Sequence, residues 1–201
     1  MLRNVRSYAI LTLVLALLCP LLFSQRGAIT LQRTLPELVA QSGVIVRGHV
    51  VSAHVEPHPQ YANLMTVVVT ISAEVSLKGN PGASFTFRQY IWDERDVMQA
   101  AGYRKGQEWL LLMNPVNSNG LTSPVALEQG RFQVFRNTAG AVTVANGRAN
   151  AGLFTGAAAQ AQRSKGTFTN RAMQMMRTPS KGPVALQDLE DAIRGFVGAN
   201  Q

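Results

Sequence analysis

The stretch Met65–Leu77, with the sequence MTVVVTISAEVSL, decides the fold, because apolar and polar residues alternate along it and only Val68 breaks the alternation. Period-two alternation places one set of side chains in a core and the other in water. The turn Lys78–Gly82 follows, and Phe85 and Phe87 then share one face of a second alternating segment. We therefore predict a β-hairpin. Its first strand exceeds the usual length of about 5–6 residues, so we expect it to twist or to curl into a barrel.

Four further strands are indicated by similar patterns, at Val44–Ala53, Glu108–Met113, Arg131–Arg136 and Ala141–Ala145. The run Glu108–Met113 is apolar on both faces after its first residue, which is typical of the most buried strand of a sheet. Gly48 lies in the middle of its strand and predicts a bulge or a sharp bend. These elements predict an all-β, mainly antiparallel fold, either a small barrel or a sandwich.

Two helices are expected to flank the strands. Thr34–Gln41 has a capping residue and an early proline. Val184–Val197 places Leu186, Leu189 and Ile193 on one face, which is typical of an amphipathic helix. Between the strands and this second helix the pattern disappears. We therefore predict a β domain over 34–147, a flexible basic linker over 148–183 and a C-terminal helix over 184–198.

The amino terminus has the pattern of a secretory signal peptide over residues 1–24. Arg3 and Arg6 precede the apolar run Tyr8–Leu18, and a cut before Gln25 would follow a small residue. The alternative is an uncleaved anchor, although the run is short for a membrane span. Cleavage would leave a secreted or periplasmic chain with no transmembrane helix and no cysteine, because Cys19 is the only one in the sequence. Such a chain depends on its core rather than on disulfides.

Positive charge is concentrated in one part of the sequence. The chain has 19 basic and 11 acidic residues, and between Glu128 and Asp188 it has eight basic residues and no acidic one. A field of one sign attracts anionic polymers or lipid headgroups, and the alternative is a solvated tail. Export disfavours nucleic acid as a partner, and these bases also lack the aromatic interleaving that is typical of stacking platforms.

The best candidates for a binding face follow the hairpin. Tyr90 and Trp92 have the parity opposite to that of Phe87, so they point outward beside Arg88 if Phe87 is buried. Exposed aromatic residues next to arginines, here Arg88 and Arg95, are typical of recognition surfaces. The alternative is a bulge after Gln89 that buries Trp92.

Catalytic and metal-binding patterns are weak. Asp93, Glu94 and Asp96 offer a general acid and base or a Ca²⁺ site, but neighbouring bases make mutual ion pairs an alternative. His49, His54 and His58 lie close in sequence, yet the first two have opposite parity, which favours surface histidines over a metal site. No nucleophile elbow, zinc-binding helix motif or phosphate loop is present in the sequence.

We therefore expect no catalytic residue, metal or cofactor. The sequence favours an exported, non-enzymatic binding or structural module that contacts an anionic envelope component, a glycan or a protein. The alternative is an extracytoplasmic hydrolase or hydrolase inhibitor that acts through the Asp93–Asp96 loop.

The region Leu35–Val144 resembles a group of bacterial secreted proteins whose domain is similar to the OB-like barrel of netrin modules and tissue inhibitors of metalloproteinases. The resemblance depends on Gly48, Lys78-Gly79, Gly106 and Gly130 in their strand contexts. It implies a small OB-like β-barrel with a short helix before it and an amphipathic helix after it. Metalloproteinase inhibition is not implied, because those inhibitors use an amino-terminal cysteine that a cleaved chain lacks.

Overall fold

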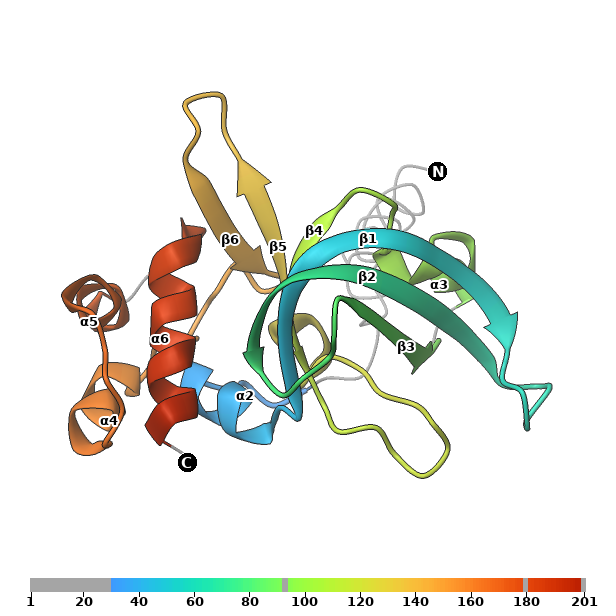
Figure 1. The fold of residues 1–201 in the computed structure, drawn as a ribbon, viewed down its shortest axis with the longest axis horizontal. Helices are drawn as coiled ribbons and strands as arrows, with labels where there is room; N and C mark the ends of the chain where they lie inside the picture. The colour runs from blue at the N-terminus through green and yellow to red at the C-terminus, as the bar shows by residue number, and fades with distance from the viewer. Residues whose placement is uncertain (1–29, 92–93, 179–180, 200–201) are drawn as a thin grey trace, which may run out of the picture.

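The computed structural model describes residues 30–91, 94–178 and 181–199, and within them a single antiparallel sheet has seven strands in the order β3-β2-β1-β4-β5-β6-β7 (Figure 1). The strands are β1 (Val44–Pro57), β2 (Met65–Lys78), β3 (Ser84–Tyr90), β4 (Glu108–Met113), β5 (Arg131–Arg136), β6 (Val142–Asn146) and β7 (Val184–Ala185). The mainly antiparallel β class is confirmed. The sheet is not a closed barrel, however, because β3 and β7 are its two edges. The expected signal peptide over 1–24 lies outside the described residues.

The predicted hairpin is formed by β2 and β3, which pair with Val69 opposite Phe87 and Ile71 opposite Phe85. Val67, Val69 and Ile71 are fully buried, as the alternation predicted. Figure 1 shows β1 and β2 as a long pair that curves strongly over β3. The apolar side chains on the inside of this curve therefore gather into a compact core.

The curvature of the β1–β2 pair is associated with β-bulges. The pairing changes register between Arg47 and Gly48, where Glu74 of β2 is left without an opposite residue. At Gly48 the two backbones approach so closely that an added Cβ would lie 2.0 Å from the carbonyl oxygen of Ser72. The predicted bulge at this glycine is confirmed, and glycine is required there because no side chain fits.

Two separate cores meet at β4, whose six residues are all buried. Leu110 and Leu112 belong to a core shared with the helices. Trp109, Leu111 and Met113 belong to the core on the inside of the curved strands β1, β2 and β3. This division explains why the strand is apolar on both faces and confirms that it is a deeply buried strand.

The α-helices in the described residues are α2 (Leu35–Gln41), α3 (Glu94–Met98), α4 (Ala157–Arg163), α5 (Asn170–Arg177) and α6 (Leu186–Ala199). Four of these five helices lie toward one end of the sheet, and α3 lies near the opposite end (Figure 1). Two of the four, α4 and α5, were not predicted from the sequence. In Figure 1, α6 lies between the sheet and the outer helices α4 and α5. The expected flexible linker over 148–183 is therefore wrong, because it contains α4 and α5 and contributes residues such as Ala161 and Met176 to the core shared with α6.

The two predicted terminal elements are confirmed with small changes in their bounds. In α2, the Glu37 carboxylate accepts hydrogen bonds from the backbone N–H of Thr34 at 2.7 Å and from its hydroxyl at 3.0 Å. Such a bond fixes the start of a helix. In α6, Leu189, Ala192 and Ile193 are fully buried, so the apolar stripe packs inside the protein. No helix in the described part of the chain is long and apolar enough to cross a membrane.

Replacing Gly48 by alanine is expected to lower the free energy of unfolding by about 3 kcal/mol, because the new methyl group forces two paired backbones apart. Denaturant unfolding at neutral pH measures the change. Gly198→Ala is the control, since an added Cβ at this exposed position in α6 meets nothing within 4 Å. We expect that control to leave stability unchanged or to raise it by up to about 1 kcal/mol. Equal stability of Gly48→Ala and the parent protein would contradict the close approach.

Candidate functional site

The loop between β4 and β5 is held in one conformation by its own polar side chains. The Asn114 amide donates to the backbone oxygen of Ser123 at 3.0 Å, and the Thr122 hydroxyl donates to the backbone oxygen of Asn114 at 2.7 Å. The Asn117 amide oxygen accepts the backbone N–H of Asn119 and that of Leu121, both at 2.9 Å. Since both arms of the loop are bonded to each other, this loop presents a fixed surface.

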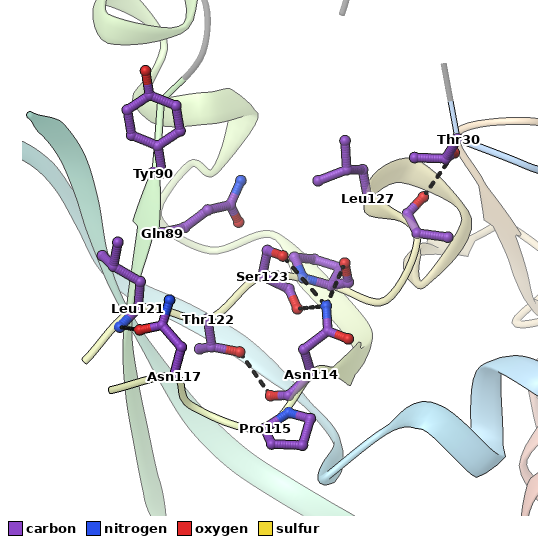
Figure 2. A pocket seen from close by; sticks show the side chains of 12 residues that line it. Thr30, Gln89, Tyr90, Asn114, Pro115, Asn117, Leu121, Thr122, Ser123 and Leu127 are labelled. Atoms are coloured by element: carbon purple, nitrogen blue, oxygen red, sulfur yellow. Dashed lines mark hydrogen bonds between the residues drawn. The ribbon is translucent and has the colours of Figure 1, made fainter. Parts of the chain in front are cut away.

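The same loop reaches the outer edge of β3 and encloses a hollow there. The backbone N–H of Thr122 donates to the backbone oxygen of Arg88 at 2.9 Å. Beyond this bond lies a hollow of about 490 Å³ (Figure 2). The residues that line it come from the segment before α2, the end of β3 and the loop: Thr30, Gln89, Tyr90, Asn114, Pro115, Asn117, Leu121, Thr122, Ser123, Pro124, Ala126 and Leu127.

The lining of this hollow is uncharged. It contains amides, hydroxyls and apolar groups, with no Asp, Glu, Lys, Arg or His among its residues. At one side, Ala126 and Leu127 both have left-handed backbone conformations, with φ of 49° and 55°. Such conformations cost about 1–2 kcal/mol per residue for non-glycine residues. The surroundings therefore hold this part of the loop in a conformation that it would not adopt alone.

Of the four predicted binding residues, the structure places only Tyr90 at the hollow. Arg88 is not among the residues that line it, and its guanidinium donates to Glu56 Oε1 at 2.5 Å and to the Thr66 hydroxyl at 2.7 Å. The hydrogen bond from Arg88 lowers the pKa of Glu56. Trp92 lies outside the described residues. Arg95 belongs to α3, and its side chain also lies outside what the structure describes.

Phe87 and Ile91 are buried, and Gln89 faces the same core, where its amide oxygen accepts a hydrogen bond from the Tyr103 hydroxyl at 3.4 Å. Strand alternation therefore continues to the end of β3, and Tyr90 lies on the opposite face. Both Gln89 and Tyr90 reach the hollow because β3 ends at its wall, as Figure 2 shows.

The acidic segment and the histidines do not form a common site in the described structure. Asp96 is exposed on α3, Asp93 lies outside the described residues, and the hydrolase hypothesis stays a prediction. His49 Nδ1 lies 2.6 Å from Glu74 Oε1, His54 Nε2 lies 3.2 Å from Glu56 Oε2, and His58 Nε2 lies 2.9 Å from the backbone oxygen of Asn119. Among the described residues, no group of three or more His, Cys, Asp or Glu side chains could hold a metal ion.

A second polar cluster lies between the sheet and α6, and its centre is Arg47 of β1. The Arg47 guanidinium donates to Glu190 at 2.7 Å, to Glu74 at 2.8 Å and to Glu108 at 2.6 Å. Arg136 of β5 donates to the second oxygen of Glu108 at 2.6 Å. The cluster joins four strands to α6, so we interpret it as a structural tie rather than as a reaction centre.

The carboxylate of Glu108 is the most deeply buried acid of this cluster, with 5% of its side chain exposed. Burial alone raises the pKa of Glu108, but the hydrogen bonds from Arg47 and Arg136 outweigh it, so the pKa falls below the ordinary value of 4.5. This cluster was not predicted from the sequence. The sequence feature that indicates it is a charged residue within an otherwise apolar strand, at Arg47 and again at Glu108.

Comparisons with protein-family models, with curated proteins and with solved structures gave no match.

Glu108→Gln is expected to lower the free energy of unfolding by about 2 kcal/mol at pH 7, since it leaves the largely buried Arg47 guanidinium, and the more exposed one of Arg136, short of one negative partner. The folded-state pKa of Glu108 is depressed, so its contribution is complete above the unfolded value of 4.5 and is lost as pH falls through the folded value. The difference between parent and variant should therefore shrink below pH 4.5 in urea unfolding.

Asp96→Asn removes an exposed carboxylate on α3 and is the control. We expect it to change stability by less than about 0.5 kcal/mol. A Glu108→Gln effect that is the same at pH 7 and at pH 3 would show that Glu108 does not act through its charge.

Proposed function

We propose that the protein is an exported, non-enzymatic binding module that binds an uncharged saccharide segment in the hollow beside Tyr90. The observation that carries this proposal is the composition of the hollow: a fixed wall of amide, hydroxyl and apolar groups without a charged side chain. Its volume of about 490 Å³ falls within the range of small-ligand sites.

The lining favours a neutral ligand over an anionic one. An anion that enters this hollow loses hydration and gains no opposite charge from the lining, which is unfavourable. A sugar has hydroxyl groups that bond to amides such as those of Gln89 and Asn117. It also has C–H faces that pack on apolar side chains, here Leu121 and Leu127.

The order of the strands supports the same proposal. β1 pairs with both β2 and β4, which gives the order β3-β2-β1-β4-β5 in the first part of the sheet. That order suits the partly open Greek-key barrel of OB folds, whose β2–β3 face, β1–β2 loop and β4–β5 loop bind oligosaccharides and oligonucleotides. The hollow lies where the β4–β5 loop meets β3, and His58 at the start of the β1–β2 loop binds Asn119. The likeness to OB folds is an analogy of strand order, and the likeness to netrin modules stays a prediction.

The test is calorimetric binding of a panel of neutral and acidic oligosaccharides to the mature chain. We expect neutral members to bind and acidic members of the same length to bind more weakly. Gln89→Glu places a negative charge in the wall and replaces a donor by an acceptor, while it keeps the oxygen that bonds to Tyr103. It should weaken binding about tenfold.

Gln60→Glu makes the same chemical change at an exposed position outside the hollow and should leave the affinity unchanged. Tighter binding of acidic members, or equal losses in both variants, would overturn the proposal. So would an absence of binding across the whole panel.

A further inference from the structure

The outer helical layer carries five exposed basic side chains, and these account for most of the positive stretch of the sequence. They are Arg163, Lys165, Arg171, Arg177 and Lys181. The other three bases of the acid-free stretch are engaged by other groups of the protein. Arg136 binds Glu108, Arg148 donates to the backbone oxygen of Thr30 at 2.9 Å, and Arg131 lies over the rings of Tyr103 and Trp109 at 5.0 Å from each.

The two helices turn these bases outward. In α5 the buried residues are Ala172 and Met176, one turn apart, and they face α6. Arg171 and Arg177 lie six residues apart on the exposed stripe, with Gln174 between them. Figure 1 shows α4 and α5 as the outermost layer at the end of the molecule that is far from β3.

Two of the three acids of α6, the helix on which α5 packs, are engaged by groups other than these bases. Glu190 and Asp191 of α6 both accept hydrogen bonds from Arg194, and Glu190 also binds Arg47. Within the described part of the chain, none of the five exposed bases forms an ion pair with an acid. The surface therefore has a field of one sign.

The side chains between the bases decide what kind of anion fits. The only aromatic residues of the acid-free stretch after residue 148 are Phe154, which is buried, and Phe168, whose ring packs on Phe196 at 4.9 Å. The surface thus offers no ring on which bases of a nucleic acid could stack. The large apolar side chains that are exposed, such as Met98 and Val116, belong to other elements, so nothing here inserts into a lipid core.

We propose that the surface formed by α4, α5 and Lys181 holds the protein on an anionic lipid membrane through charge alone. The five bases are spread over α4, α5 and the segments that follow them, so together they match an extended charged plane. Each lysine or arginine near an anionic leaflet strengthens attachment about fivefold. This attachment leaves the hollow beside Tyr90, at the other end of the sheet, open to its ligand.

The test is cosedimentation of the mature chain with phosphatidylcholine vesicles that either contain or lack phosphatidylglycerol. The parent chain should bind only the anionic vesicles and should be released as salt rises, because surface charges are screened. The double variant Arg171→Glu/Arg177→Glu should lose at least about 30-fold in affinity for the anionic vesicles.

The matched control is Arg104→Glu/Lys105→Glu, which alters the net charge by the same amount at exposed positions before β4. It should retain binding within about threefold. A second pair, Arg163→Glu at the end of α4 and Lys165→Glu just after it, repeats the test if α5 is damaged. Circular dichroism reports whether each variant is folded.

Equal losses in the test and control pairs would overturn the proposal, since net charge alone would then explain attachment. Binding to neutral vesicles or binding that is insensitive to salt would also overturn it. So would capture by a soluble sulfated polysaccharide without any binding to anionic vesicles, because that result would identify a polymer rather than a membrane as the partner.

Discussion

The structure depends on one constraint: β4 must be buried on both faces. Trp109, Leu111 and Met113 must be covered by the curved strands β1, β2 and β3. Leu110 and Leu112 must be covered by the helices. Burying a large apolar side chain stabilises a protein by about 1.5–3 kcal/mol, so neither face can be left to water. The C-terminal helices are for this reason part of the same folded unit as the sheet. Arg47 adds a polar tie at the same junction, because its partners come from β2, β4 and α6.

Local patterns were sufficient to predict most of the sheet. Alternation in Met65–Leu77 identified the faces of β2, and the two-sided apolar run identified β4. The segment 148–183 was missed for a physical reason. Helices α4 and α5 are only 7 and 8 residues long, and helices of that length gain their stability from packing rather than from their own sequence. Contacts such as that of Met176 with the shared core bring together residues that are far apart, and no local pattern reports them.

The candidate site was predicted only in part, again because its walls come from distant segments. Tyr90 was singled out by its parity, and it does lie at the hollow. Arg88 was expected beside it, but a carboxylate on β1, Glu56, lies within reach and binds it instead. The opposite wall is a loop whose shape is set by side-chain bonds such as those of Asn114 and Asn117. The amino-acid sequence of that loop indicates only that the loop is polar and rich in turn residues.

Together these features describe a curved sheet that presents an uncharged hollow at one end and a basic helical layer at the other. The central claim is that the hollow is the ligand site. It is tested most directly by two-dimensional NMR of residues 25–201, with side-chain amide signals assigned, during titration with a neutral oligosaccharide. We predict that the signals of Gln89, Asn114 and Asn117 shift in proportion to ligand, while those of Gln60 and Gln174 stay fixed. Shifts confined to residues outside the hollow, or no shifts at all, would contradict the account.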